Sequence, residues 1–96
     1  MPEKDILKIN RKDIIRIARQ HGALEVRLFG SFAKGTASQS SDVDILVEME
    51  PGRSLLDLVA IKQDLEDLLG RAVHIVTPPS LSPYIRDGVL KEAVRL

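Results

Sequence analysis

The 96-residue sequence contains no cysteine, which excludes disulfides, cysteine-ligated zinc and thiol catalysis. Its three aromatic residues are too few for a platform on which nucleic-acid bases stack. Fourteen Lys and Arg residues are balanced by fourteen Asp and Glu, so no surplus of positive charge favours direct nucleic-acid binding. No apolar run approaches the roughly 20 residues of a membrane helix, and the polar start is unlike a signal peptide. We therefore expect a cytoplasmic protein that binds neither nucleic acid directly nor a membrane.

Apolar residues recur along the chain with alternating helix and strand spacings, which predicts an α/β fold. Leu24, Val26 and Leu28 alternate with other side chains, as on a strand with one buried face. Asn10, with Asp13 three residues later, predicts the capped start of a first helix. The expected strands cover residues 24–29, 42–48 and 72–77, and the expected helices follow Asn10, Ser54 and Ser82.

This order predicts one domain over residues 1–96, an α/β (α+β) sandwich with a small mixed three-stranded sheet and helices packed on it. The long helix between the second and third strands suits a crossover between parallel strands. About a dozen residues join the first two strands, and we expect that pair to be antiparallel. Such a pairing brings Gly30, Ser31 and Asp42 to the same end of the sheet.

Asp42 and Asp44 form one candidate site. A strand period of two places both carboxylates on one face, about 7 Å apart. Anions this close repel, and a divalent cation such as Mg²⁺, which takes oxygen ligands and substrate phosphates, removes that cost. Two aspartates at a solvated strand end are also common, so the pair alone leaves both interpretations open.

Gly30 and Ser31 form the complementary half of the candidate site. A glycine where a strand meets a helix lets the backbone approach a ligand closely. The turn that follows points N–H groups at an anion, and the Ser31 hydroxyl adds a hydrogen bond to a phosphate oxygen. Lys34, one turn later, would place a positive charge near the same phosphate, although a solvated surface lysine fits the sequence equally well.

The spacing of these residues resembles that of a known family. Gly30-Ser31, ten further residues and Asp42-x-Asp44 are similar to the signature of the polymerase-beta-like nucleotidyltransferase superfamily. The stretches 29–37, 41–48 and 76–86, with the tail 90–94, resemble the minimal nucleotidyltransferase group within it. The resemblance covers nearly the whole chain and implies the nucleotidyltransferase fold.

This resemblance implies transfer of a nucleotide, usually AMP from ATP, to a hydroxyl group with loss of pyrophosphate. It implies that Gly30 and Ser31, with Lys34 and Ser41, hold the nucleotide. Asp42 and Asp44 would hold two Mg²⁺ ions, with Mn²⁺ as an alternative metal. Members of this group are commonly paired with a HEPN-domain toxin, which they neutralise as antitoxins by binding it and by transferring AMP to one of its tyrosines.

The sequence departs from the family pattern on the third strand, where His74 stands in place of an expected third carboxylate. A neutral imidazole suits Mn²⁺ or Zn²⁺ better than Mg²⁺, and it also serves as a general base near neutral pH. Equally, His74 fits as a strand histidine hydrogen-bonded to the backbone, with no catalytic part.

Three functions follow for comparison. The first is an active transferase that modifies its partner, with His74 completing the catalytic set of Asp42 and Asp44. The second is a catalytically weakened, nucleotide-binding antitoxin that neutralises its HEPN partner by contact. Transfer to a small molecule ranks last, because the chain is too short to carry the additional domain of such enzymes.

Overall fold

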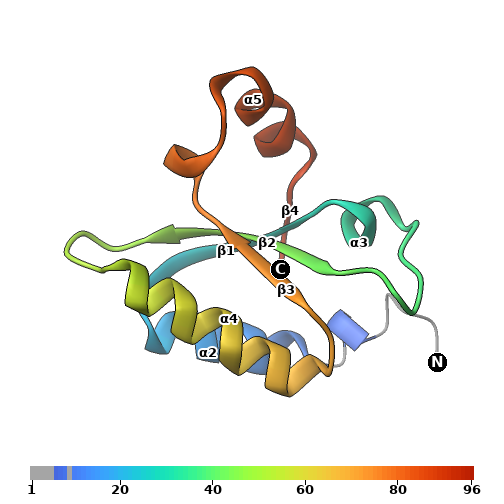
Figure 1. Ribbon diagram of the computed structural model, residues 1–96, viewed down its shortest axis with the longest axis horizontal. Coiled ribbons are helices and arrows are strands. Elements are labelled where there is room, and N and C mark those ends of the chain that lie inside the picture. Colours follow the sequence, from blue (N-terminus) through green and yellow to red (C-terminus); the bar gives the residue numbers. More distant parts are fainter. Residues whose placement is uncertain (1–5, 9) are drawn as a thin grey trace.

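In the computed structural model, which describes residues 6–8 and 10–96, a four-stranded mixed sheet forms the centre of the protein (Figure 1). Its strand order is β3-β2-β1-β4. β1 pairs antiparallel with both β2 and β4, whereas β2 pairs parallel with β3. The strands are β1 (Ala23–Phe29), β2 (Val43–Met49), β3 (Val73–Val76) and β4 (Val94–Arg95).

Helices lie on both sides of the sheet (Figure 1). α2 (Arg11–Gln20) and α4 (Leu55–Leu69) cover one face, and α5 (Pro83–Glu92) stands on the opposite side. The short helix α3 (Ser31–Lys34) follows β1, and the 3₁₀ turn η1 (Pro78–Ser80) leads from β3 into α5. This arrangement confirms the α/β sandwich that the sequence predicts.

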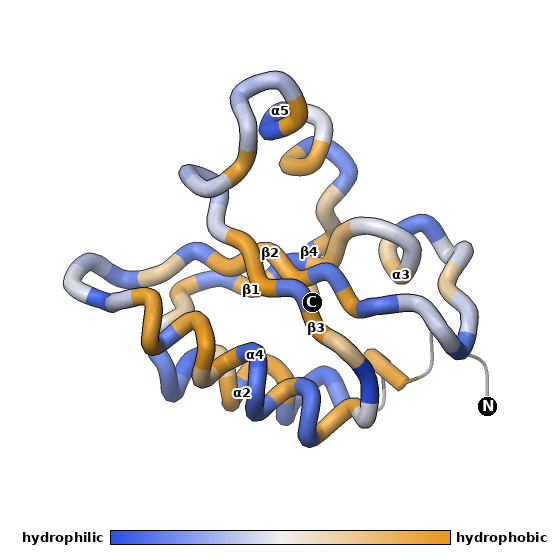
Figure 2. The backbone as a smooth tube through the Cα atoms, in the orientation of Figure 1, coloured by the Kyte–Doolittle hydropathy of each residue, from blue (hydrophilic) through white to orange (hydrophobic). Residues whose placement is uncertain are grey.

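The hydrophobic core lies between the sheet and the helix pair α2 and α4. Hydrophobic and hydrophilic residues alternate along the turns of both helices, as expected for helices with one buried side (Figure 2). β2 is one of the two inner strands of the sheet, and most of its residues are buried. The fully buried side chains of the core include Ile14, Val43, Ile45, Val47, Ile61 and Leu65.

Local signals in the sequence place the ends of α4 and α5. The Ser54 N–H donates to Asp57 Oδ2 at 2.9 Å, which satisfies a free amide at the start of α4. Gly70 adopts a left-handed conformation, with φ 68°, where α4 ends. Before α5, the Ser82 hydroxyl accepts a hydrogen bond from the Tyr84 N–H at 3.3 Å. These helix starts and the crossover between parallel strands are confirmed.

The predicted number of strands is wrong. β4 adds a fourth strand beside β1, with Leu28 opposite Val94 and Arg27 opposite Arg95. Two residues are too few to produce an alternating hydrophobic pattern, and Val94 is 53% exposed, so no burial signal marks this strand.

The predicted inward face of the first strand is wrong at Leu24. The pairing with β2 shifts between Ala23 and Glu25, which is a bulge. Ala23 is buried and Leu24 is 61% exposed, while Val26 and Leu28 point inward as predicted. The inserted residue shifts the alternation of buried and exposed side chains by one position. The residue types alone do not reveal this bulge.

The predicted capping box at the first helix is also wrong. The Asn10 side chain makes no cap to α2, because its Nδ2 donates to the carbonyl of Ile6 at 2.7 Å. Asp13 instead accepts a hydrogen bond from Arg16 at 3.4 Å on the exposed side of the helix. The helix itself starts where the sequence predicts.

Among the described residues, no helix combines the length and apolar character needed to cross a lipid bilayer.

Candidate active site

Strand pairing brings the candidate residues of three strands to one end of the sheet. Phe29, at the end of β1, lies opposite Asp44 near the start of β2. Asp44 lies in turn beside His74 of β3 in the parallel pair. The loop that begins at Gly30 therefore lies next to the two aspartates, as the antiparallel pairing predicts.

Gly30 gives Asp44 room to approach the backbone. The residue has φ 72° and ψ −150°, a backbone conformation that residues other than glycine rarely adopt. A Cβ on Gly30 would collide with the carboxylate of Asp44. The chain then turns directly into α3, where the Gly30 carbonyl accepts from the Lys34 N–H at 3.1 Å and the Ser31 carbonyl accepts from the Thr36 N–H at 2.9 Å.

The folded protein disfavours the ionised form of the Asp44 carboxyl. Burial raises the pKa of the Asp44 carboxyl, and the negative charge of Asp42 raises it further, while His74 acts in the opposite direction. A partly buried carboxylate that is unfavourably charged gains from a bound cation.

His74 is positioned by its neighbours to hold Asp42. Its Nε2 lies 2.8 Å from Asp42 Oδ2 in a pair that is about half exposed on both sides. Glu66 of α4 fixes the start of β3, because its Oε2 accepts the Val73 N–H at 3.0 Å. The hydrogen bond from the Val73 N–H, and to a smaller extent the one from Lys62, lowers the pKa of the Glu66 carboxyl. The structure thus gives His74 a side-chain partner, where the sequence left a purely backbone-bonded histidine open.

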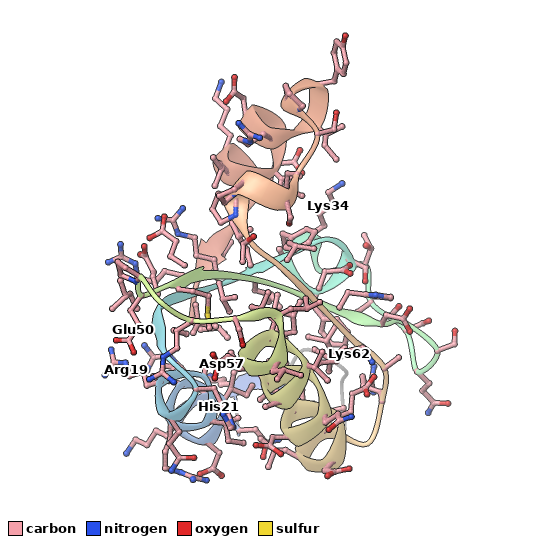
Figure 3. The ribbon with its side chains drawn as sticks, turned by 60° about the vertical axis from the view of Figure 1, so that its left-hand side comes forward. Arg19, His21, Lys34, Glu50, Asp57 and Lys62 are labelled. Atoms are coloured by element: carbon pink, nitrogen blue, oxygen red, sulfur yellow. The ribbon has the colours of Figure 1, made fainter. Side chains whose placement is uncertain are left out.

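Lys34 does not point into the loop. Its Nζ lies 3.7 Å from Glu92 Oε2 of α5, and both side chains are exposed. Figure 3 shows Lys34 reaching from α3 towards α5. In this arrangement Lys34 ties the two helices together, and it would have to leave Glu92 to contact a phosphate beside Ser31.

Ser41 shapes the loop before β2. Its hydroxyl accepts the Ser38 N–H at 2.8 Å, which closes the turn between the two serines. Arg71 holds the same turn from outside, donating to the carbonyls of Ser38 at 3.2 Å and Ser41 at 3.3 Å. The Arg71 guanidinium also lies 5.2 Å from the centre of the Phe32 ring. Sequence reasoning missed Arg71, since its partners are carbonyls distant in the chain.

The donor set suits a hard divalent cation that is only partly enclosed by protein. In the part of the chain that the structure describes, no three acidic or histidine side chains converge on a point that could hold a metal. Asp42 and Asp44 supply carboxylate oxygens, while the near ring nitrogen of His74 is engaged by Asp42. Mg²⁺ prefers oxygen ligands and keeps several of its positions for water and substrate phosphates, so two aspartates fit this ion.

Two hollows lie away from these residues. One of about 770 Å³ is mainly apolar and lies between the end of β2, the start of α4 and η1. A second, of about 380 Å³, lies where α2, β1 and β4 meet. Neither is lined by Gly30, Ser31, Asp42, Asp44 or His74.

The mixed sheet, its crossover helix and the Gly-Ser loop facing an Asp-x-Asp strand define a nucleotidyltransferase fold. The chain belongs to the nucleotidyltransferase domain family, whose model matches residues 11–96.

Several known proteins resemble this chain over most of its length. One from Methanocaldococcus jannaschii, named a putative protein adenylyltransferase, is 46% identical over 90 residues, covering 94% of this chain and 96% of the relative. The protein adenylyltransferase MntA of Thermococcus cleftensis is 38% identical over 91 residues, covering 95% and 89%.

Solved structures agree with this assignment. The structure described as a putative minimal nucleotidyltransferase superposes with a TM-score of 0.88 at 44% identity, covering 97% of this chain and 95% of that one. A toxin-antitoxin crystal structure with AMP-PNP superposes with a TM-score of 0.77 at 26% identity, covering 90% and 71%.

Proposed function

We propose that this protein transfers AMP from ATP to a hydroxyl group on a partner protein. The partner that fits is a HEPN-domain toxin, the acceptor is one of its tyrosines, and the protein is its antitoxin. The observation that supports the proposal is the contact between the Gly30 loop and Asp44, because a turn suited to phosphate then lies beside two carboxylates suited to a metal ion. The names of the relatives support the choice of AMP and of a protein acceptor.

Each part of the site has a task in this reaction. The backbone at Gly30 and the N–H and hydroxyl of Ser31 hold triphosphate oxygens. Asp42 and Asp44 would hold Mg²⁺ or Mn²⁺, which supplies positive charge against the triphosphate and the departing pyrophosphate. The acceptor hydroxyl oxygen attacks the α-phosphorus and loses its proton to solvent, the bond from that phosphorus to the α,β-bridging oxygen breaks, and pyrophosphate leaves with that oxygen. Lys34 joins the nucleotide-binding set when it exchanges Glu92 for a phosphate.

His74 acts in this account as a positioning residue. Its ring, bonded to Asp42 Oδ2, limits the directions in which that carboxylate can point. Ser41 contributes through the turn that precedes Asp42. Both residues thereby fix the carboxylate and leave its second oxygen available.

The same histidine supports a second candidate function, a nucleotide-binding antitoxin that neutralises its partner by contact with little transfer. An imidazole carries no negative charge at neutral pH, so the site holds one anion fewer than the family pattern implies. Nucleotide binding through Gly30, Ser31, Asp42 and Asp44 is retained in this alternative.

The test is a transfer assay with the purified protein and the protein encoded beside it. ATP labelled at the α-phosphate should label the partner in the presence of Mg²⁺ or Mn²⁺, whereas ATP labelled at the γ-phosphate should not. The D42N/D44N variant should lose labelling, and D67N is the matched control because Asp67 is exposed on α4.

Two other outcomes are informative. Neutralisation of the partner by D42N/D44N without any labelling by the unaltered protein would favour the contact-only antitoxin. Absence of both labelling and neutralisation would overturn the proposed function.

A further inference from the structure

α5 has one side that faces the rest of the molecule. Its half-buried residues Arg86, Val89 and Leu90 recur at helical spacing, whereas Tyr84 and Ile85 are 98% and 54% exposed. The helix stands on the side of the sheet opposite α2 and α4 (Figure 1). Arg86 therefore lies on the inner side of α5.

The same side of the sheet carries the candidate active site. Val43 and Ile45 of β2 and Val73 of β3 are buried in the core with α4. Because successive strand residues point to opposite faces, Asp44 and His74 point to the face over which α5 stands. The far end of α5 is tied to the phosphate-binding turn region through Glu92 and Lys34. Arg86 precedes Glu92 by six residues, about 9 Å along a helix axis.

Arg86 is incompletely satisfied in this position. One of its terminal nitrogens donates to the carbonyl of Leu81 at 2.9 Å. Its Nε is fully covered and has no hydrogen-bond partner, and none of the described carboxylates forms an ion pair with it. By contrast, Arg27 and Arg53 pair with nearby glutamates. The guanidinium is half-buried and its charge has no counter-ion among the described residues, so a bound anion would stabilise it.

We propose that Arg86 binds a phosphate of the nucleotide from the α5 side, opposite the Gly30 turn. The planar guanidinium presents several donors in a fixed fork that matches phosphate oxygens. The nucleotide is then held between α5 and the sheet, with Asp42 and Asp44 below it. This inference rests on the proposed function, because it assigns a further ligand to the same nucleotide.

The test compares nucleotide binding by the full chain and its variants, using calorimetry with ATP, ADP and adenosine in the presence of Mg²⁺. R86Q should weaken ATP and ADP binding about tenfold or more and leave adenosine binding unchanged, since only the phosphates meet the guanidinium. R86K should recover part of the loss, because it keeps the charge and loses the fork. K91Q is the control, since Lys91 is an exposed cation on the same helix.

The outcomes separate this inference from the proposed function. ATP binding by R86Q equal to that of the unaltered protein overturns the role of Arg86 alone. Equal loss of ATP and adenosine binding, accompanied by a lower melting temperature, also overturns it, because Arg86 would then only anchor the Leu81 carbonyl. Failure of the unaltered protein to bind ATP overturns the proposed function and this inference with it.

Discussion

The carboxylate of Asp44 lies against the α-carbon of Gly30, in the space that a side chain on residue 30 would fill. Two segments separated by a long loop thereby meet without an intervening side chain. The left-handed φ of Gly30 directs the chain from β1 into α3 at this point. Packing and backbone conformation both require glycine here.

Gly30→Ala should lower stability and abolish transfer. The strained backbone costs about 1–3 kcal/mol, and the new Cβ displaces the Asp44 carboxylate. Gly35→Ala is the matched control, because Gly35 has φ 74° but no atom within 4 Å of an added Cβ. Thermal unfolding and α-phosphate labelling should show G35A losing stability but keeping transfer. Equal activities for the two variants would contradict the role of the Gly30 contact.

Asp44→Asn should stabilise the protein at neutral pH while removing activity. Burial, with Asp42, raises the pKa of Asp44 in the folded state. The contribution of the protonated carboxyl is therefore complete below its unfolded-state pKa and is lost as the pH rises through the folded-state pKa. Asparagine has no charge to desolvate. The melting temperature of D44N should exceed that of the unaltered protein by a few degrees at pH 7.

The difference should shrink as the pH falls below the range in which carboxyl groups titrate. D67N, with its exposed position, should follow the unaltered protein at every pH. A D44N variant that melts lower at pH 7 would contradict the strained-anion description.

His74→Asp should increase transfer about tenfold in Mg²⁺, since a third carboxylate strengthens metal binding. Without metal, the new anion faces Asp42 and Asp44 and lowers the melting temperature. Added Mg²⁺ should therefore stabilise H74D more than the unaltered protein. The Mn²⁺ affinity, followed by electron paramagnetic resonance, should rise in parallel. H74N controls for loss of the imidazole, and unchanged metal affinity in H74D would show that residue 74 lies outside the metal site.

Glu66→Ala should weaken the start of β3 and with it the placement of His74. The variant leaves the Val73 N–H without its acceptor and removes the ion pair with Lys62. The pKa of Glu66 is lowered in the folded state, so its contribution is present above the unfolded-state pKa and is lost as the pH falls through the folded-state value. The melting temperature of E66A should thus fall at pH 7 and match the unaltered protein more closely in acid. A constant difference across this pH range would contradict the assignment.

The sequence predicted those helices and strands that are long enough to show a regular spacing of apolar residues. The strand expected over residues 42–48 and the helix expected after Ser54 depend on neighbouring residues, and both are confirmed. Leu24 was predicted to face inward, but the bulge in β1 turns its side chain outward. Only the pairing with β2 reveals that bulge. The two-residue strand β4 depends on backbone pairing, to which side-chain type contributes little.

The candidate site was predicted from residue types and their spacing rather than from hydrophobic patterns. The pattern of Gly30, Ser31, Asp42 and Asp44 contains the relevant residue types, and antiparallel pairing predicts their meeting. The contacts of Lys34 with Glu92 and of His74 with Asp42 depend on how distant elements pack, so the sequence left both open. Arg86 ends the stretch 76–86 that resembles the family, but its missing partner is visible only once its surroundings are folded.

The most direct measurement is a crystal structure of the protein with Mn²⁺ and a non-hydrolysable ATP analogue. We expect triphosphate density against Gly30 and Ser31, with anomalous density from Mn²⁺ at the carboxylates of Asp42 and Asp44. Nucleotide bound elsewhere, for example in the apolar hollow beside η1, or Mn²⁺ absent from both aspartates, would contradict the account.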